Sequence, residues 1–158
     1  MKLTRILMPA LFGLAIFCSC RDQDESRSGL LDSIPADKYY STDPFQDKFS
    51  QIYGEWQVIG TGGGITGAGY APDFEYLVIK PNAIFGIVRG DSLVATGKIE
   101  VQNDPDFDLL IHLISDDNNT ENIQIIRDYE KFVSFPSDSM LLYSTCCDRF
   151  DTYLRKVK

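Results

Sequence analysis

His112 and the adjacent cysteines Cys146 and Cys147 are the side chains best suited to act as a base or a nucleophile. The chain has one histidine, so a three-histidine zinc site cannot form, and a Ser-His-Asp relay would depend on His112 alone. Nothing in the spacing places His112 beside either cysteine, so we do not expect nucleophilic catalysis. In an oxidising compartment the cysteine pair could form a vicinal disulfide, bridge to another chain or stay free. We favour a vicinal disulfide or inert thiols over a redox function, because no partner motif accompanies the pair.

A glycine-rich segment at residues 61–70 contains a literal Gly-x-Gly-x-x-Gly between Gly62 and Gly67. A dinucleotide site needs a helix directly after this motif, and residues 71–73 lead into a strand pattern instead. The clustered aspartates near residues 104–117 lack the spacing and the glycine of a calcium loop and fit solvated turns. The sequence therefore predicts no catalytic residue, no metal site and no cofactor, and we do not expect an enzyme.

Apolar and polar residues alternate from Tyr53 to the end of the chain, a pattern typical of half-buried β-strands. Short turns separate these strands and no helix of crossover length occurs, so neighbouring strands should pair antiparallel. Residues 43–49 predict one short N-terminal helix, with Asp43 as its cap. The predicted inward rows are Trp56 and Val58; Phe74, Tyr76 and Val78; Ala83, Phe85 and Ile87; Leu93, Ala95, Gly97, Ile99 and Val101; Phe107, Leu109, Ile111 and Leu113; and Ile123 with Ile125.

Further strand segments near residues 132–135, 140–143 and 150–154 bring the total to eight or nine. Such a set predicts an all-β fold: a single antiparallel up-and-down β-barrel with one short N-terminal helix. Closure is favoured because it removes the unpaired edges that an open sheet of this length would expose.

Two motifs carry a resemblance to the lipocalin fold. Gly-Glu-Trp at residues 54–56 resembles its Gly-x-Trp signature, and Tyr-Leu-Arg at residues 153–155 resembles its C-terminal partner. In lipocalins the tryptophan packs across the closed end of the barrel and an arginine lies over the indole, a contact of about 0.5–2 kcal/mol. The resemblance implies this structural role for Gly54, Trp56 and Arg155. The whole pattern is similar to lipocalin-like domain lipoproteins of the Bacteroidota.

A lipocalin-like barrel implies a ligand site at the open end, under a lid formed by the loop at residues 61–70. We expect a small apolar or amphipathic ligand there. The alternative is a loop that only covers the core, on a filled barrel that acts as a non-enzymatic surface scaffold for a protein partner. The candidate lining and lid residues are Ile65, Tyr70, Phe74, Tyr76, Phe85, Leu93, Ile99, Phe107, Ile111 and Leu142.

The N-terminus has the features of a secretory signal. Lys2 and Arg5 flank the start of an apolar run at residues 6–17, which is too short to span a membrane. Phe-Cys-Ser-Cys at residues 17–20 resembles the lipobox of bacterial lipoproteins, which implies that Cys20 is lipidated and begins the mature chain. An ordinary signal peptide cut elsewhere, with Cys20 a plain thiol, is the alternative.

These features divide the chain into a signal peptide at 1–19, a lipidated Cys20 with a flexible acidic tether at 20–42, and a barrel domain at 43–158. The residues after Cys20 fit a solvated spacer, and they also resemble the acidic export signal of Bacteroidota surface lipoproteins. We expect an outer-membrane lipoprotein, on the periplasmic or the surface face of the cell envelope, held by the lipid on Cys20. The formal net charge of −8 argues against nucleic-acid binding, because an acidic body avoids phosphate backbones.

Overall fold

The computed structural model describes residues 32, 34, 43–45, 48–64, 67–102, 109–116, 122–127, 130–144 and 149–157. Several predictions concern residues outside these ranges. They are the signal peptide at 1–19, Cys20, most of the tether, Ile65, Phe107, Cys146 and Cys147.

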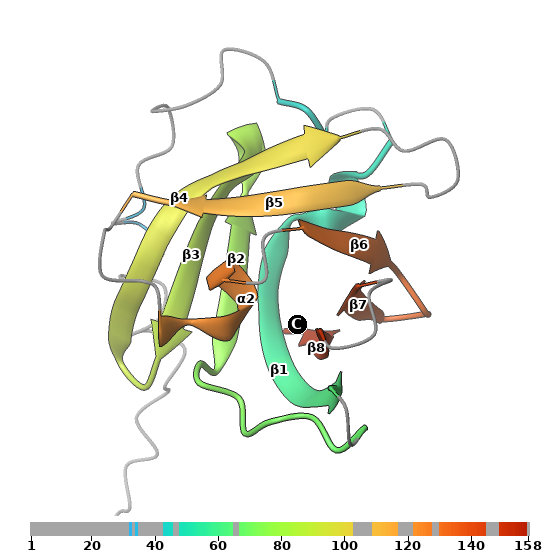
Figure 1. The fold of residues 1–158 in the computed structure, drawn as a ribbon. Helices are drawn as coiled ribbons and strands as arrows, with labels where there is room; N and C mark the ends of the chain where they lie inside the picture. Colours follow the sequence, from blue (N-terminus) through green and yellow to red (C-terminus); the bar gives the residue numbers. More distant parts are fainter. Residues whose placement is uncertain are drawn as a thin grey trace, which may run out of the picture.

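Eight antiparallel strands form one closed up-and-down barrel, in which each strand pairs with its neighbours in the sequence and β1 pairs with β8 (Figure 1). This confirms the predicted fold class. The strands are β1 (Gly54–Gly63), β2 (Tyr76–Lys80), β3 (Ile84–Arg89), β4 (Ser92–Gln102), β5 (Leu110–Ser115), β6 (Glu130–Ser134), β7 (Ser139–Tyr143) and β8 (Phe150–Lys156). Short helical segments accompany them at η1 (Ser50–Ile52), η2 (Pro81–Ala83) and α2 (Gln124–Arg127).

Ile123 and Ile125, which the alternation predicted as a strand, belong instead to the connection that contains α2. The N–H groups of Ile126 and Arg127 both donate to Ile123 O at 3.0 Å. Local helical hydrogen bonds therefore replace strand pairing here, and two apolar residues in alternation are too short a pattern to separate the two cases.

The predicted helix at residues 43–49 is only partly described. Phe45 N–H donates to Asp43 Oδ1 at 3.0 Å, and Phe49 N–H donates to Phe45 O at 3.1 Å. The segment η1 follows directly and leads into β1. Asp43 thus accepts a hydrogen bond at the start of this turn, as a capping residue does.

The antiparallel register defines two ends of the barrel. One end, which we call the closed end, holds η1, η2 and the β6–β7 turn. The opposite end, which we call the mouth, holds the β1–β2 connection at residues 64–75, the β3–β4 turn, the β5–β6 connection with α2, and the β7–β8 connection.

Buried apolar side chains form two clusters, one on each side of the sheet. The outer cluster lies against β2 and β3 and consists of Ile34, Tyr76, Val78, Ile84 and Val88, with Leu93 and Val157 packed on it. The inner cluster lies on the side of the sheet that faces the barrel interior. It consists of Phe45, Ile52, Trp56, Phe74, Leu77, Ile79, Ala83, Phe85, Ile87, Ala95, Ile99, Leu109, Ile111, Leu113, Ile123, Ile125, Val133, Met140, Leu142 and Leu154.

Tyr76, Val78 and Leu93 lie in the outer cluster, contrary to the inward rows predicted for them. Both sides of β2 are apolar and buried, so alternation alone could not choose its inner side. Leu93 faces outward because the register shifts between Ile87 and Val88, a β-bulge that changes the side on which β4 residues lie.

Ile34, within the predicted tether, packs against the outer side of the barrel. It is 2% exposed, and its carbonyl accepts a hydrogen bond from Lys80 Nζ at 3.5 Å. Gly86 provides the space for it, because a Cβ atom at Gly86 would lie 2.5 Å from Ile34 Cδ1 and 3.0 Å from Leu93 Cδ1. The chain therefore contacts the barrel well before η1.

We expect Gly86→Ala to lower the free energy of unfolding by about 1–3 kcal/mol, because the added methyl group would overlap Ile34. In the double variant with Ile34→Ala, the loss should be smaller than the sum of the two single losses, as measured by chemical denaturation. Gly97→Ala is the matched control, since its Cβ would lie 2.0 Å from Ile114 O, and Ile34→Ala cannot relieve that overlap. Additive energies for Gly86 and Ile34 would contradict the contact.

Candidate ligand-binding site

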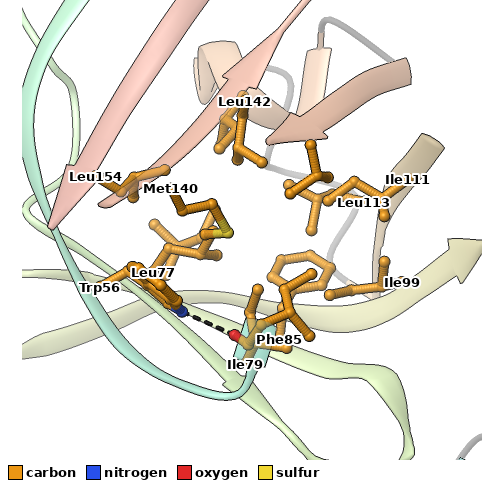
Figure 2. Close-up of a cluster of buried hydrophobic side chains, with 14 of the residues drawn as sticks. Trp56, Leu77, Ile79, Phe85, Ile99, Ile111, Leu113, Met140, Leu142 and Leu154 are labelled. Carbon is orange, nitrogen blue, oxygen red and sulfur yellow. Dashed lines mark hydrogen bonds between the residues drawn. The ribbon is translucent and has the colours of Figure 1, made fainter. Parts of the chain in front are cut away.

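The inner cluster forms a continuous apolar lining of the barrel (Figure 2). The labelled side chains come from β1 to β5, β7 and β8 and point toward the barrel axis. Four residues that the sequence suggested as ligand lining, Phe85, Ile99, Ile111 and Leu142, are buried among them. With Val133 of β6 included, the inner side therefore offers apolar surface from all eight strands.

Trp56 lies at the closed end of this lining. Its indole N–H donates to Ile52 O at 2.8 Å, and the bond is buried (Figure 2). The Phe135 ring packs beside the indole with a centroid distance of 6.3 Å, and Phe45 is fully buried in the same cluster. Trp56 thus fixes η1 across this end of the barrel, with its one polar atom satisfied.

Lys156, and not Arg155, places its charge over the indole. Lys156 Nζ lies 5.2 Å from the Trp56 ring centroid, whereas the exposed Arg155 donates from Nη2 to Gln57 Oε1 at 3.0 Å. The register pairs Trp56 with Lys156 and Gln57 with Arg155, so alternation along β8 turns Arg155 outward. The predicted role of Arg155 is therefore corrected to Lys156, whose Cε lies 3.2 Å from where a Cβ of Gly54 would be.

Tyr53 extends the aromatic packing at the closed end. Its ring meets the Phe45 ring edge-on with a centroid distance of 5.9 Å. Burial, followed by the nearby Asp43 carboxylate, raises the pKa of Tyr53 above its ordinary range. The folded state therefore holds the phenol proton more tightly than the unfolded state. Any stability gained this way is present below the unfolded pKa of about 10 and is lost only as the pH rises further.

Asp73 links two connections and the end of β3 at the mouth. It belongs to the β1–β2 connection, and its Oδ2 accepts a hydrogen bond from Gln124 N–H, at the start of α2, at 2.9 Å. Its backbone carbonyl accepts a hydrogen bond from Nε of Arg89, the last residue of β3. One residue thus joins the β1–β2 connection to α2 and to the end of β3.

Three apolar side chains, which we call the mouth cover, lie next to these contacts. They are Phe74, Ile123 and Ile125, all buried in the inner cluster. Phe74 was a predicted lining residue, and it reaches the interior from the connection rather than from a strand. A molecule that entered the barrel at the mouth would have to displace this cover.

The described part of the predicted lid folds back onto the end of β1. Thr61 Oγ1 donates to Tyr70 O and accepts from Tyr70 N–H at 3.0 Å. Gly69 has a φ of +70°, and a Cβ atom there would lie 2.6 Å from Thr61 O. The half-buried Tyr70 ring meets Phe150 of β8 edge-on, with a centroid distance of 4.9 Å. Gly69 therefore permits a close approach of the loop backbone to Thr61.

Lys131 and Thr152 are the buried polar or charged side chains among the described residues, each 1% exposed. Lys131 lies two positions before Val133 of the inner cluster on β6, so both face the inside. Lys131 Nζ donates to Phe150 O on β8. Thr152 alternates with Leu154 of the inner cluster. The described interior is therefore apolar from the closed end to the mouth cover, with one ammonium group and one hydroxyl group buried toward the mouth.

The sequence interpretation did not identify Lys131. Residues 130–134 read Glu-Lys-Phe-Val-Ser, and the aromatic Phe132 favours the assignment of its own row, rather than the row with Lys131, to the inner side. The signal that could have found Lys131 is its position in the same alternating row as Val133. A lysine at an inward position is rarely fully buried unless it has a partner.

His112, the residue best suited to act as a base, lies on the outer side of β5. It pairs with Glu100 in the β4–β5 register. Lys98 Nζ donates to Glu100 Oε1 at 2.7 Å. This hydrogen bond lowers the pKa of the Glu100 carboxyl, and the charges of Lys98 and His112 add to the effect. His112 thus faces a surface ion pair and not the inner cluster.

Within the described ranges, no three His, Cys, Asp or Glu side chains form a group that could hold a metal ion. None of the helices in the described part of the chain combines the length and the apolar character needed to cross a bilayer. Comparisons with protein-family models, curated proteins and solved structures give no match. Any functional argument therefore depends on the geometry of the barrel itself.

We expect Asp73→Ala to lower the free energy of unfolding by about 0.5–2 kcal/mol, because Gln124 N–H at the start of α2 loses its acceptor. Amide hydrogens at residues 122–127 should exchange faster, as measured by hydrogen exchange with mass spectrometry. Asp91→Ala, in the exposed β3–β4 turn, is the matched control. Unchanged exchange at residues 122–127 in Asp73→Ala would show that the carboxylate does not hold α2.

Proposed function

We propose that this protein is an envelope-anchored, lipocalin-like lipoprotein that binds a small apolar or amphipathic molecule inside its barrel. The observation that carries the proposal is a closed eight-strand barrel whose inner side is apolar except for Lys131 and Thr152 among the described residues. Binding would be driven by removal of apolar ligand surface from water, which favours enclosed sites of this chemistry.

The difference between the two ends supports binding from the mouth. At the closed end, η1 is fixed by the buried indole hydrogen bond of Trp56. At the mouth, the short helix α2 is joined to the β1–β2 connection by the hydrogen bond from Gln124 N–H to Asp73 Oδ2, and neither segment is a strand of the barrel. Segments held in this way open more readily than strands of a closed ladder, so access is easiest at the mouth.

The second candidate is a filled barrel that presents its loops to a protein partner at the cell surface. The burial of the mouth cover in the inner cluster favours it, because small eight-strand barrels can be filled by their own side chains. Ligand binding and a filled interior make opposite predictions for a larger residue placed on the inner side. Ala95, buried in the inner cluster on β4, is a suitable position.

We expect wild-type protein to bind the neutral fluorescent probe N-phenyl-1-naphthylamine saturably, and Ala95→Leu to weaken this binding by about tenfold or more with little loss of stability. A filled barrel predicts no saturable binding and a loss of about 1–3 kcal/mol on unfolding for the same variant, because the interior is overpacked. Thr96→Leu, which adds a leucine on the outer side of the same strand, is the matched control. Fluorescence titration and chemical denaturation measure the two quantities.

The proposed anchor is tested separately. We expect wild-type protein expressed with its full N-terminus in a bacterial host to fractionate with membranes, and Cys20→Ala to appear in the soluble fraction, because its lipid attachment site is lost. Cys18→Ala is the control, since Cys18 lies in the same segment but is not the predicted lipidation site. Equal membrane association of the two variants would contradict lipidation at Cys20.

A further inference from the structure

Ile34 attaches the chain to the outer side of β2 and β3, ahead of the first strand. Its side chain is 2% exposed, and Lys80 Nζ donates to its backbone oxygen at 3.5 Å. Gly86 leaves room for it, because a Cβ atom there would lie 3.4 Å from Ile34 Cγ1 and 2.5 Å from Ile34 Cδ1. The residues around it, which we call the Ile34 seat, are Tyr76, Val78, Ile84, Gly86 and Val88.

The seat would be an apolar surface on the outside of the barrel if Ile34 did not cover it. Tyr76 and Val78 alternate along β2 with Leu77 and Ile79, which belong to the inner cluster. Removal of apolar surface from water is favourable, so burial of Ile34 stabilises the attached state on both sides of the contact. The seat therefore fits the segment of its own chain that occupies it.

The position of Ile34 along the chain matters because Cys20 is the proposed lipid attachment site. Residues 21–29 are polar or glycine, so they offer no apolar side chain that could pack on the barrel. The first apolar residues after Cys20 are Leu30, Leu31 and Ile34. Attachment at Ile34 is thus close to the earliest point that the sequence permits.

This attachment shortens the connection between lipid and barrel. A chain spans at most about 3.6 Å per residue, so the path from Cys20 to Ile34 is limited to roughly 50 Å. A path that first met the barrel at Asp43 could extend to roughly 80 Å. Ile34 therefore removes more than a third of the greatest separation.

The seat also determines which side of the barrel is held. It lies on the wall formed by β2 and β3, and Gly86 is in the middle of β3, between the closed end and the mouth. In a closed barrel of eight strands, β6 is four strands from β2 in either direction and so lies on the opposite side. An anchor that acts through Ile34 draws the β2–β3 wall toward the membrane and leaves the β6 side facing away.

We infer that Ile34 is the point at which the membrane anchor holds the barrel, so that residues 21–33 alone set its distance from the membrane. The inference rests on the proposed function, because it requires the lipid on Cys20. It extends that function, which by itself leaves open both the length of the connection and the side of the barrel that is held.

The test places the same Gly-Ser insertion of about ten residues at two positions in the full-length, lipidated protein. One insertion precedes residue 25 and lies between Cys20 and Ile34. The other precedes residue 39 and lies between Ile34 and β1. Both chains have the same total length, so they differ only in whether the added residues come before or after the seat.

The readout is energy transfer from Trp56, the one tryptophan of the chain, to dansyl-phosphatidylethanolamine in phosphatidylcholine vesicles. We expect the insertion before Ile34 to lower the transfer about twofold, because a longer chain lets the barrel move farther from the lipid. The insertion after Ile34 should leave the transfer unchanged. An equal decrease in both chains, or no decrease in either, would overturn the inference while leaving the anchor in place.

A release variant tests the seat itself. In the chain with the insertion after Ile34, Ile34→Asp should lower the transfer to the level of the other insertion, because a carboxylate is not stable in an apolar seat. Ile59→Asp is the matched control, since Ile59 is 54% exposed on β1, and it should have no effect. Unchanged transfer in Ile34→Asp would contradict the role of the seat.

Thermal unfolding of each chain confirms that the comparison is between folded barrels. Failure of the protein without insertions to remain with the vesicles would overturn the lipid anchor, and the inference with it.

Discussion

The ladder between β1 and β8 joins the first and last strands and turns an eight-strand sheet into a barrel. Its register, from Trp56 opposite Lys156 to Gly63 opposite Phe150, decides what lies at each end. It brings the Lys156 ammonium group over the indole at the closed end. At the mouth it fixes the carbonyl that Lys131 reaches. Two cation contacts at opposite ends of the interior thus depend on one strand pairing.

The sequence was sufficient to predict a closed up-and-down barrel of eight or nine strands, because period-two alternation is clear in β4, although Ile123 and Ile125 were wrongly assigned to a strand. It was not sufficient for β2, where Tyr76 and Val78 are as apolar as Leu77 and Ile79. The inner side of that strand is chosen by packing, since Ile34 covers the outer side. Such a contact between distant parts of the chain leaves no local pattern.

Two other differences arise from single-residue shifts. The β-bulge opposite Val88 turns Leu93 outward, although the residues after it follow the predicted row. Arg155 and Lys156 are both cations beside each other in the sequence, and only the pairing of β8 with β1 decides which one faces the indole. Because side chains alternate along a strand, an error of one position reverses the side on which a residue is placed. The candidate site was therefore predicted in part: Phe85, Ile99, Ile111 and Leu142 are inside, and Tyr76 and Leu93 are not.

The position of each residue along its strand also determines where polar side chains lie in the interior. Apolar side chains line the interior from Trp56 to the mouth cover, and the buried Lys131 and Thr152 lie toward the mouth. The Lys131 ammonium group is hydrogen-bonded there, because its Nζ donates to Phe150 O on β8.

The shared contacts of Asp73 bear on the rate at which an enclosed molecule would leave the barrel, rather than on its affinity. Since one residue holds the β1–β2 connection, α2 and Arg89 together, movement of any one of them disturbs the others. The mouth is then expected to open as one event instead of by independent fluctuations of its loops. The residence time of any enclosed molecule would be governed by how often these contacts break together, so a tightly closed mouth could make release slow even for a weakly held molecule.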